Sequence, residues 1–255
     1  MKYGGQMFSL RGQLKDEAGY DRCFGLVKNM GAEVVQLSAT GGGSISPDVV
    51  KRVSDKYELP VCVTHDPWDR LTGDLDALVK EHRTFGCAGL GVGMMPKQYR
   101  TGKREDIEAF IKELNAVAAK LKDNGMTVSY HNHWFEFDEI DGKKIYDMLI
   151  EGTTDVLFIP DTFWMRVKGQ DIEGYLAKLS GRIDTLHLKD YKKSCGLPVF
   201  RAVGKGVLDF ESILKAAKAA GVKNCVAELD ISPNPIKSTE FSMKTIAELR
   251  KKIGD

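Results

Sequence analysis

The chain has 255 residues, a length at which one α/β barrel domain spanning residues 1–255 is expected. Its 42% hydrophobic and 29% charged residues are ordinary for a globular protein and exclude a disordered chain. Lysine plus arginine (37) nearly balance aspartate plus glutamate (36), so the formal charge of +1 provides no field to attract a nucleic-acid partner.

Short apolar runs alternate with amphipathic helical patterns along the whole chain, which is typical of βα units around a parallel sheet. Eight runs are expected to form strands: Met7–Leu10, Glu33–Leu37, Val61–Thr64, Gly89–Met94, Met126–Tyr130, Val156–Ile159, Thr185–Leu188 and Cys225–Leu229. Eight helices are expected at residues 16–30, 46–57, 72–85, 103–124, 143–151, 171–180, 209–221 and 238–252. These units predict a single (βα)8 TIM barrel, because its closed sheet leaves no strand edge unpaired.

An open doubly wound sheet is the alternative arrangement of the same units. Its dinucleotide-binding form needs a G-x-G-x-x-G turn after an early strand. The glycine-rich stretch Thr40–Ser44 does not match that motif. We expect this stretch to be a βα loop near the active face of a barrel.

The N-terminal residues Met-Lys-Tyr-Gly-Gly-Gln lack the apolar region of a signal peptide. No run approaches the roughly 18 consecutive apolar residues of a membrane-spanning helix. The five cysteines contain no C-x-x-C pair and are expected to be free thiols. These features predict a cytoplasmic protein without a membrane partner, and they leave a homo-oligomer open.

Polar side chains gather where the expected strands end, which is where barrel enzymes place their chemistry. His131 and His133 follow the fifth run with one residue, Asn132, between them. In an extended backbone the two histidines therefore project from the same face. Four of the five histidines lie at strand ends, and His82, on a helix, is expected to be a solvated surface residue.

Four consecutive strand ends each supply one residue able to bind a metal: His131, Asp161, His187 and Glu228. Taken alone, Asp161 could be a helix cap and His187 a core histidine, so their shared position in the repeat is what favours a metal site. Two imidazoles with two carboxylates suit manganese, zinc, cobalt or iron better than calcium. The expected cofactor is a divalent cation, and manganese, zinc, cobalt and magnesium all stay open.

The chain resembles the xylose-isomerase-like barrel superfamily, in particular its sugar phosphate isomerase/epimerase group, which also contains inosose dehydratase-like proteins. The resemblance rests on Tyr130–His133, His187–Asp190, Val203–Phe210 and Glu228. It implies a (βα)8 barrel, a divalent metal on the four residues above, and proton transfer next to a carbonyl. Many ketose epimerases of this group have a glutamate where His131 stands, paired with the one at Glu228, and here that pair is broken.

The loss of that pair leaves the second acid/base group to be found, because a histidine bound to metal can hardly act as a base. His133 is the candidate beside Glu228, although it could instead bond the substrate or a loop carbonyl. Lys189 faces the same side as His187 and could hold a developing enolate oxygen, or pair with Asp190 at the rim.

Substrate contacts are expected from aromatic, imidazole and guanidinium groups near the strand ends. Trp68 and Trp134 could stack on a sugar ring, or they could be packing residues. His65 could bond sugar hydroxyls. Arg201, with Lys205, could contact a phosphate or could be solvated.

These features predict a metal-dependent sugar isomerase or epimerase that acts on a small-molecule keto-sugar through an enediolate. A lyase that eliminates a β-leaving group from an inosose or a 3-keto-glycoside shares the first step and is the alternative. Two further alternatives are a non-catalytic or partner-dependent sugar-binding subunit and an abasic-site endonuclease. The near-neutral charge and the small ligand set argue against the endonuclease.

Overall fold

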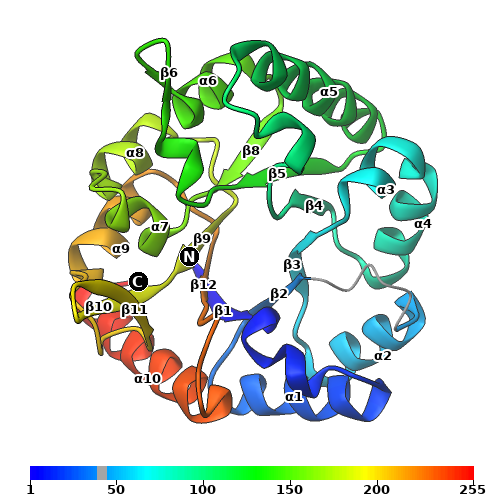
Figure 1. Ribbon diagram of the computed structural model, residues 1–255. Coiled ribbons are helices and arrows are strands. Elements are labelled where there is room, and N and C mark those ends of the chain that lie inside the picture. Colours follow the sequence, from blue (N-terminus) through cyan, green and yellow to red (C-terminus); the bar gives the residue numbers. More distant parts are fainter. Residues whose placement is uncertain (39–44) are drawn as a thin grey trace.

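A computed structural model describes residues 1–38 and 45–255 of the chain as a ring of strands surrounded by helices (Figure 1). Within these residues eight strands form the barrel: β1 (Lys2–Gln6), β2 (Val34–Ser38), β3 (Val61–His65), β4 (Gly89–Val92), β5 (Thr127–His131), β8 (Val156–Ile159), β9 (Thr185–Leu188) and β12 (Asn224–Ala227). The expected loop Thr40–Ser44 lies outside the described residues.

The strands pair in parallel in the order β3-β2-β1-β12-β9 and in the order β4-β5-β8. Backbone hydrogen bonds join these groups on both sides. The Asp66 amide donates to the Gly91 carbonyl over 2.8 Å beside β3 and β4, and the His187 amide donates to the Pro160 carbonyl over 2.9 Å beside β8 and β9. The ring is thereby closed, and the predicted (βα)8 barrel is confirmed.

The outer layer consists of helices whose apolar faces pack on the strands (Figure 1). In α5 the buried Ile107, Phe110 and Leu114 recur at steps of three and four residues, as expected of a helix with one buried face. The helices are α1 (Glu17–Asn29), α2 (Pro47–Tyr57), α3 (Trp68–Gly73), α4 (Leu75–Phe85), α5 (Arg104–Asp123), α6 (Ile145–Gly152), α7 (Thr162–Val167), α8 (Ile172–Lys178), α9 (Phe210–Ala219) and α10 (Pro235–Ile253).

Shorter elements decorate the ends of the barrel. They are the 3-10 turns η1 (Met7–Gln13), η2 (Lys97–Tyr99) and η3 (Phe135–Phe137), the hairpin of β6 (Glu139–Ile140) with β7 (Lys143–Lys144), and the hairpin of β10 (Asp190–Ser194) with β11 (Leu197–Arg201). None of the described helices combines the length and the apolar character needed to span a membrane. All five cysteines are free, as predicted.

The first strand is the largest error of the sequence-based prediction. Met7–Leu10 lies in η1, and β1 is the glycine-containing segment before it. Gly4 is required there because a Cβ atom would lie 1.8 Å from the Val34 carbonyl oxygen of β2. The close approach of two backbones therefore replaces the apolar side chains by which a strand is normally recognised.

His82 was also wrongly expected to be solvated. Its side chain is only 2% exposed on α4. Its ring lies 2.8 Å from the Leu78 carbonyl through Nδ1 and 2.8 Å from the Thr64 hydroxyl through Nε2. The helix therefore carries a histidine on its buried face because a strand residue distant in sequence provides a polar partner.

The segment after the β10–β11 hairpin is bound to the barrel by one buried carboxylate. The side chain of Asp190 accepts backbone N–H groups from Tyr191, Gly204, Gly206 and Val207 over 2.8–3.1 Å. A Cβ atom on Gly206 would lie 2.1 Å from the Asp190 carboxylate and 2.3 Å from the Tyr191 carbonyl oxygen. Only glycine allows this contact.

We expect Gly206→Ala to lower the free energy of unfolding by about 1–3 kcal/mol or more, because the new methyl group overpacks a buried, hydrogen-bonded carboxylate. Urea unfolding measures this change. Gly12→Ala is the control, since nothing lies within 4 Å of a Cβ atom at that position. Equal unfolding midpoints for the two variants would contradict the role given to Gly206.

Candidate active site

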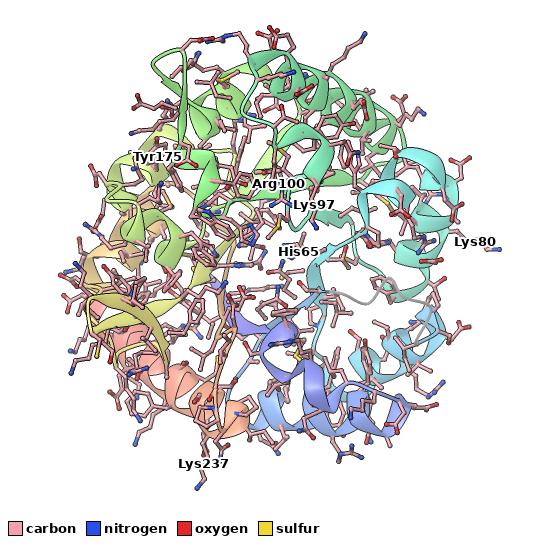
Figure 2. All side chains as sticks on the ribbon, viewed as in Figure 1. His65, Lys80, Lys97, Arg100, Tyr175 and Lys237 are labelled. Carbon is pink, nitrogen blue, oxygen red and sulfur yellow. The ribbon has the colours of Figure 1, made fainter. Side chains whose placement is uncertain are left out.

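A cavity of about 460 Å³ opens at the carboxyl ends of the barrel strands. Its lining includes His65, His131, His133, Lys189 and Glu228. Figure 2 shows the labelled His65 near the centre of the ring of strands, whereas Lys80 and Lys237 project outward from the surface. The strand-end positions selected from the sequence therefore do face one common space.

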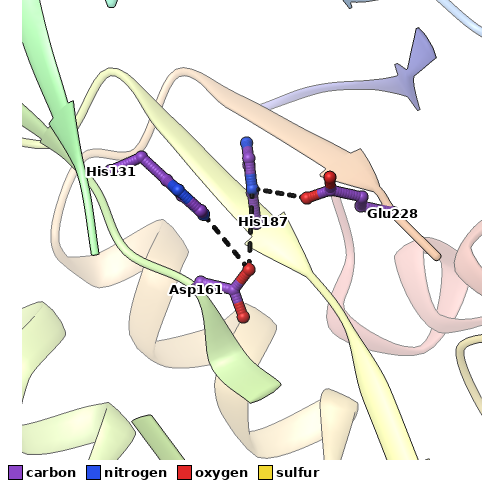
Figure 3. A group of neighbouring side chains, drawn as sticks. All are labelled: His131, Asp161, His187 and Glu228. Atoms are coloured by element: carbon purple, nitrogen blue, oxygen red, sulfur yellow. Dashed lines mark hydrogen bonds and ion pairs between the residues drawn. The ribbon is translucent and has the colours of Figure 1, made fainter. Parts of the chain in front are cut away.

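The four expected metal ligands converge at this cavity. His131 ends β5, Asp161 follows β8, His187 lies in β9 and Glu228 follows β12. One ligand atom from each residue lies within 4.8 Å of the others, and all four residues are buried (Figure 3). The Nε2 atom of His131 lies 3.2 Å from the Asp161 carboxylate, and Nδ1 of His187 lies 2.8 Å from that of Glu228.

Hydrogen bonds behind these residues fix which atoms face one another. Nδ1 of His131 lies 3.0 Å from the Gly93 carbonyl oxygen, so the proton is on Nδ1 and Nε2 is left as an acceptor. Nε2 of His187 donates to Oε1 of Gln36 over 2.6 Å, and Nδ1 faces the Glu228 carboxylate. Burial would lower the pKa of His187, but Glu228 and Asp161 outweigh burial and raise it, so Nδ1 becomes an acceptor when a cation replaces its proton. Polar groups behind a histidine commonly orient metal ligands in this way.

Asp161 combines the two roles that the sequence could not separate. Its Oδ1 atom caps α7 by accepting the backbone N–H groups of Phe163 (2.9 Å) and Trp164 (3.1 Å). Its Oδ2 atom faces the two imidazoles. The Asp161 amide in turn donates to the Asn132 side-chain oxygen over 3.0 Å, which holds the end of β8 against the end of β5.

The donor set fits a divalent cation. Once Nδ1 of His187 has lost its proton, the facing atoms of all four residues are acceptors. Nδ1 of His187 and Oε2 of Glu228 are buried 2.8 Å apart, and Nζ of Lys189 lies 3.2 Å from that oxygen. Two imidazole nitrogens and two carboxylate oxygens that face one another are stabilised by a bound cation and suit a first-row divalent metal.

Lys189 is the one ammonium group in this cluster among the described residues, and it is only 2% exposed. Its Nζ atom lies 3.1 Å from Asp161, 3.2 Å from Glu228 and 2.9 Å from Asp230. Burial alone would lower the pKa of Lys189, but the three carboxylates outweigh burial and raise it. The lysine is therefore charged, and it contacts these acids rather than its neighbour Asp190.

The pKa values of the acidic partners of Lys189 are shifted in opposite directions. Burial raises the pKa of Glu228, but Lys189 and His187 outweigh that effect and hold it well below its usual range. Burial raises the pKa of Asp230 to about 6. Asp230 was not selected from the sequence as a site residue, although its position two residues after Glu228 places it on the same side of the chain.

His133 lies in the cavity beside His131, with 4.7 Å between the two ring centroids. Trp164 also packs near His133, with 5.6 Å between the ring centroids. Burial, followed by the neighbouring His131, lowers the pKa of His133 well below its usual value. Nδ1 of His133 is buried and has no hydrogen-bond partner within residues 1–38 and 45–255. A neutral imidazole thus faces the space beside the cluster.

His65 lines the cavity, but its ring nitrogens are already hydrogen-bonded. Nε2 lies 2.9 Å from the Gln36 amide nitrogen, and Nδ1 lies 2.9 Å from the Ser38 hydroxyl. Burial, and then His131 and His187, lower the pKa of His65, so the ring is neutral. The ring has no nitrogen left for the sugar hydroxyls that it was expected to bind.

The two tryptophans expected to bind substrate lie in different surroundings. Trp134 lines the cavity, is 42% exposed and lies 5.1 Å from the ring of Trp164. Trp68 instead packs on Phe110 and Tyr99, with ring centroids at 4.9 and 6.4 Å. The expectation of a substrate contact at Trp68 is therefore corrected to a packing role.

Arg201 and Lys205 line a neighbouring hollow of about 540 Å³. Arg201 donates to the Phe200 carbonyl over 2.8 Å, and Lys205 lies 4.1 Å from the ring centroid of Phe241. The structure does not bring either residue into the lining of the first cavity. Arg11, in η1, does line that cavity and was not selected from the sequence, although it directly follows the run Met7–Leu10.

Comparisons with known proteins agree on the fold. Residues 24–249 match the family model described as the xylose isomerase-like TIM barrel. An inosose dehydratase of Geobacillus thermodenitrificans is 27% identical over 168 residues, which cover 59% of this chain and 56% of that protein. The chain thus spans about half the length of this curated relative.

Two solved structures resemble the whole chain. A sugar phosphate isomerase/epimerase from Parabacteroides distasonis has a TM-score of 0.81 at 22% identity, covering 97% of this chain and 98% of the other. A probable 3-DHS dehydratase from Bacillus anthracis has a TM-score of 0.76 at 13% identity, covering 97% and 99%. At these identities the structures establish the fold and leave the reaction to the residues of the site.

Proposed function

Because the chain belongs to the xylose isomerase-like TIM barrel family, we propose that it is a divalent-metal-dependent isomerase or epimerase of a keto-sugar. The proposal rests mainly on the four buried acceptor atoms of His131, Asp161, His187 and Glu228, which converge at the cavity. A bound cation would act as a Lewis acid on the carbonyl and hydroxyl oxygens of the substrate. The remaining chemistry is assigned to side chains of the chain itself.

Lys189 is proposed to stabilise negative charge. Its ammonium group lines the cavity and is held by the carboxylates of Asp161, Glu228 and Asp230. A substrate oxygen that becomes negative when the adjacent C–H proton is removed would lie close to this fixed positive charge. Preorganised charges of this kind favour the transition state over the ground state.

His133 and Glu228 are proposed as the acid/base pair. His133 presents a neutral imidazole to the cavity from the end of β5, and Glu228 faces the same cavity from the end of β12. Strands β8 and β9 separate these two positions around the barrel. Removal of a proton by one group and its return by the other would invert a carbon or move a carbonyl.

A dehydratase is the second candidate, and the match to inosose dehydratases favours it. Here one base removes the proton next to the carbonyl, and the hydroxyl on the next carbon leaves as water after it gains a proton. This reaction needs one base and one acid but no pair of opposed carboxylates. The histidine that stands where many epimerases have a glutamate is compatible with it.

The test is proton exchange in deuterated water, followed by NMR with the chain loaded with Mn²⁺ or Zn²⁺. Ketoses, inososes and 3-keto-glycosides are the probes. We expect metal-dependent exchange of the C–H proton next to the carbonyl, and the product then separates epimerisation from dehydration. Absence of exchange with all three substrate classes would instead support a non-catalytic sugar-binding subunit.

We expect Trp134→Ala to raise the KM for the substrate about 10-fold and to leave metal affinity unchanged, because an exposed aromatic wall of the cavity is lost. Steady-state kinetics and Mn²⁺ titration measure the two effects. Trp68→Phe is the comparison, since it should cost stability in the core and leave KM as it is. A larger KM change in Trp68→Phe than in Trp134→Ala would show that Trp68, and not Trp134, contacts the substrate.

A further inference from the structure

A row of hydrogen-bonded side chains connects His187 to the wall of the cavity. Nε2 of His187 contacts Oε1 of Gln36 at 2.6 Å, and Nε2 of Gln36 contacts Nε2 of His65 at 2.9 Å. Nδ1 of His65 contacts the Ser38 hydroxyl at 2.9 Å, and the Gln6 amide donates to the same hydroxyl over 2.6 Å. Strands β9, β2, β3 and β1 each contribute to this row.

The direction of every bond in the row follows from the state of His187. When Nδ1 of His187 binds a cation, the ring proton is on Nε2, which donates a hydrogen bond to Oε1 of Gln36. The amide group of Gln36 then donates to Nε2 of His65. The proton of the His65 ring is therefore on Nδ1 and is donated to the Ser38 oxygen.

The Ser38 oxygen thereby accepts two hydrogen bonds. The second, from Gln6, has a fixed direction because the Gln6 side-chain oxygen already accepts the Phe8 amide over 3.1 Å. With both lone pairs occupied, the hydroxyl proton of Ser38 can only be donated elsewhere. Among the described residues it has no further acceptor, and Ser38 lines the cavity.

The geometry points to Ser38 as a substrate-binding residue that donates its hydroxyl proton to a carbonyl or hydroxyl oxygen of the substrate, with Gln36 and His65 as positioning residues that fix this direction. The inference rests on the proposed function, since it requires a cation on His187 and a sugar-like substrate. It adds a donor on the β2 side of the cavity, away from Lys189.

Without a cation, the hydrogen bonds from His187 through Gln36 and His65 to Ser38 can run in the opposite direction. Nδ1 of His187 then keeps its proton and donates a hydrogen bond to the Glu228 carboxylate over 2.8 Å, which leaves Nε2 as the acceptor. The amide of Gln36 would be reversed, and Ser38 would donate to His65 instead of to the cavity. Cation binding and the availability of the Ser38 proton are therefore coupled through Gln36.

Close packing restricts rotation of the His65 ring away from Gln36 and Ser38. A Cβ atom on Gly93 would lie 2.9 Å from Nδ1 of His65, so the loop after β4 lies directly against the ring. Gly93 also binds Nδ1 of His131 through its carbonyl oxygen. Gly93 thus contacts both His131, a candidate metal ligand, and His65, the positioning histidine.

The direct test is NMR of the full chain with ¹⁵N-labelled histidine and bound Zn²⁺, which shows which ring nitrogen of each histidine carries the proton. The five histidines are few enough to assign by single substitution. We expect His65 to be protonated on Nδ1 in the zinc form and to lose this preference in Gln36→Met. We also expect Gln36→Met to weaken Zn²⁺ binding about 10–100-fold.

Protonation of His65 on Nε2 with zinc bound would overturn this inference and leave the metal site intact. Unchanged signals of His131 and His187 on addition of zinc would instead overturn the proposed function together with the inference. The two failures are therefore distinguishable.

The substrate contact is tested by kinetics with an inosose. We expect Ser38→Ala to lower kcat/KM about 10–100-fold with metal affinity unchanged, because a hydrogen bond to the substrate is lost. Ser129→Ala is the control, since the hydroxyl of Ser129 is buried in β5 without a hydrogen-bond partner in the described part of the chain. A wild-type kcat/KM in Ser38→Ala would overturn the contact.

Discussion

Asp161→Asn is expected to weaken Mn²⁺ binding more than 100-fold and to lower the rate of proton exchange by about 10³-fold or more, while the protein stays folded. Loss of an orienting group behind a metal ligand already costs about 10–100-fold, and loss of one transition-state donor about 10²–10³-fold. The amide oxygen can still cap α7 as Oδ1 of Asp161 does. The amide N–H₂ would face Nε2 of His131 and Nδ1 of His187, and would satisfy these acceptors without a cation.

The matched control is Asp209→Asn. Asp209 caps α9 through the backbone N–H groups of Glu211 and Ser212, both at 3.1 Å, in the same way as Asp161 caps α7. It is not part of the metal-ligand group among the described residues. Mn²⁺ titration and NMR exchange should therefore be near wild type in this variant. Equal Mn²⁺ affinity in the two variants would show that Asp161 is only a cap.

Lys189→Met is expected to change the metal-free and the metal-loaded protein differently. Without metal, Asp161 and Glu228 lose their buried counter-charge, which should lower the free energy of unfolding by about 3–5 kcal/mol. A divalent cation restores that counter-charge, so added Mn²⁺ should stabilise the variant more than the wild type. Turnover should still fall about 10²–10³-fold, because the positive charge near the substrate oxygen is gone.

Thermal unfolding with and without Mn²⁺ measures the first two effects, and proton exchange measures the third. Lys215→Met serves as the control, since that lysine pairs with Glu211 on the exposed side of α9. If the metal-free Lys189→Met protein were as stable as the wild type, Lys189 would not be the counter-charge that Asp161 and Glu228 require. Full turnover in the metal-loaded variant would remove Lys189 from the chemistry.

The strands that the sequence predicts best are those buried on both faces. Val156–Ile159 and Thr185–Leu188 have the bounds expected from their continuous apolar runs. Strand β1 was missed because Gly4 and Gly5 provide no apolar side chains, and at Gly4 the close approach of β2 leaves no room for one. The apolar pattern alone could not show a strand whose fit depends on the neighbouring backbone.

The ligand group was predictable because a repeated βα unit places each strand end at the same level of the barrel. His131, Asp161, His187 and Glu228 could therefore be selected by position, and the structure brings them together. The partners behind them could not, because Gln36 of β2 meets His187 of β9 only inside the barrel, past the intervening strands β1 and β12. Such contacts depend on register across strands that are distant in sequence.

Side-chain direction was the other feature that the sequence did not contain. Trp68 and Trp134 both follow strand ends, yet one packs on Phe110 and the other lines the cavity. The difference arises because α3 begins at Trp68 and turns its ring toward α5, while Trp134 precedes the 3-10 turn η3. Local pattern predicts that a tryptophan lies near the site but not which way it faces.

The central claim is that one divalent cation binds to the group formed by His131, Asp161, His187 and Glu228. Elemental analysis of the protein after equilibration with Mn²⁺ and gel filtration tests it most directly, on the wild type and on the His131→Ala and Glu228→Gln variants. The account predicts about one bound cation per wild-type chain and a loss of most of it in both variants, because each substitution removes one of the four ligands. Unchanged stoichiometry in both variants would contradict it.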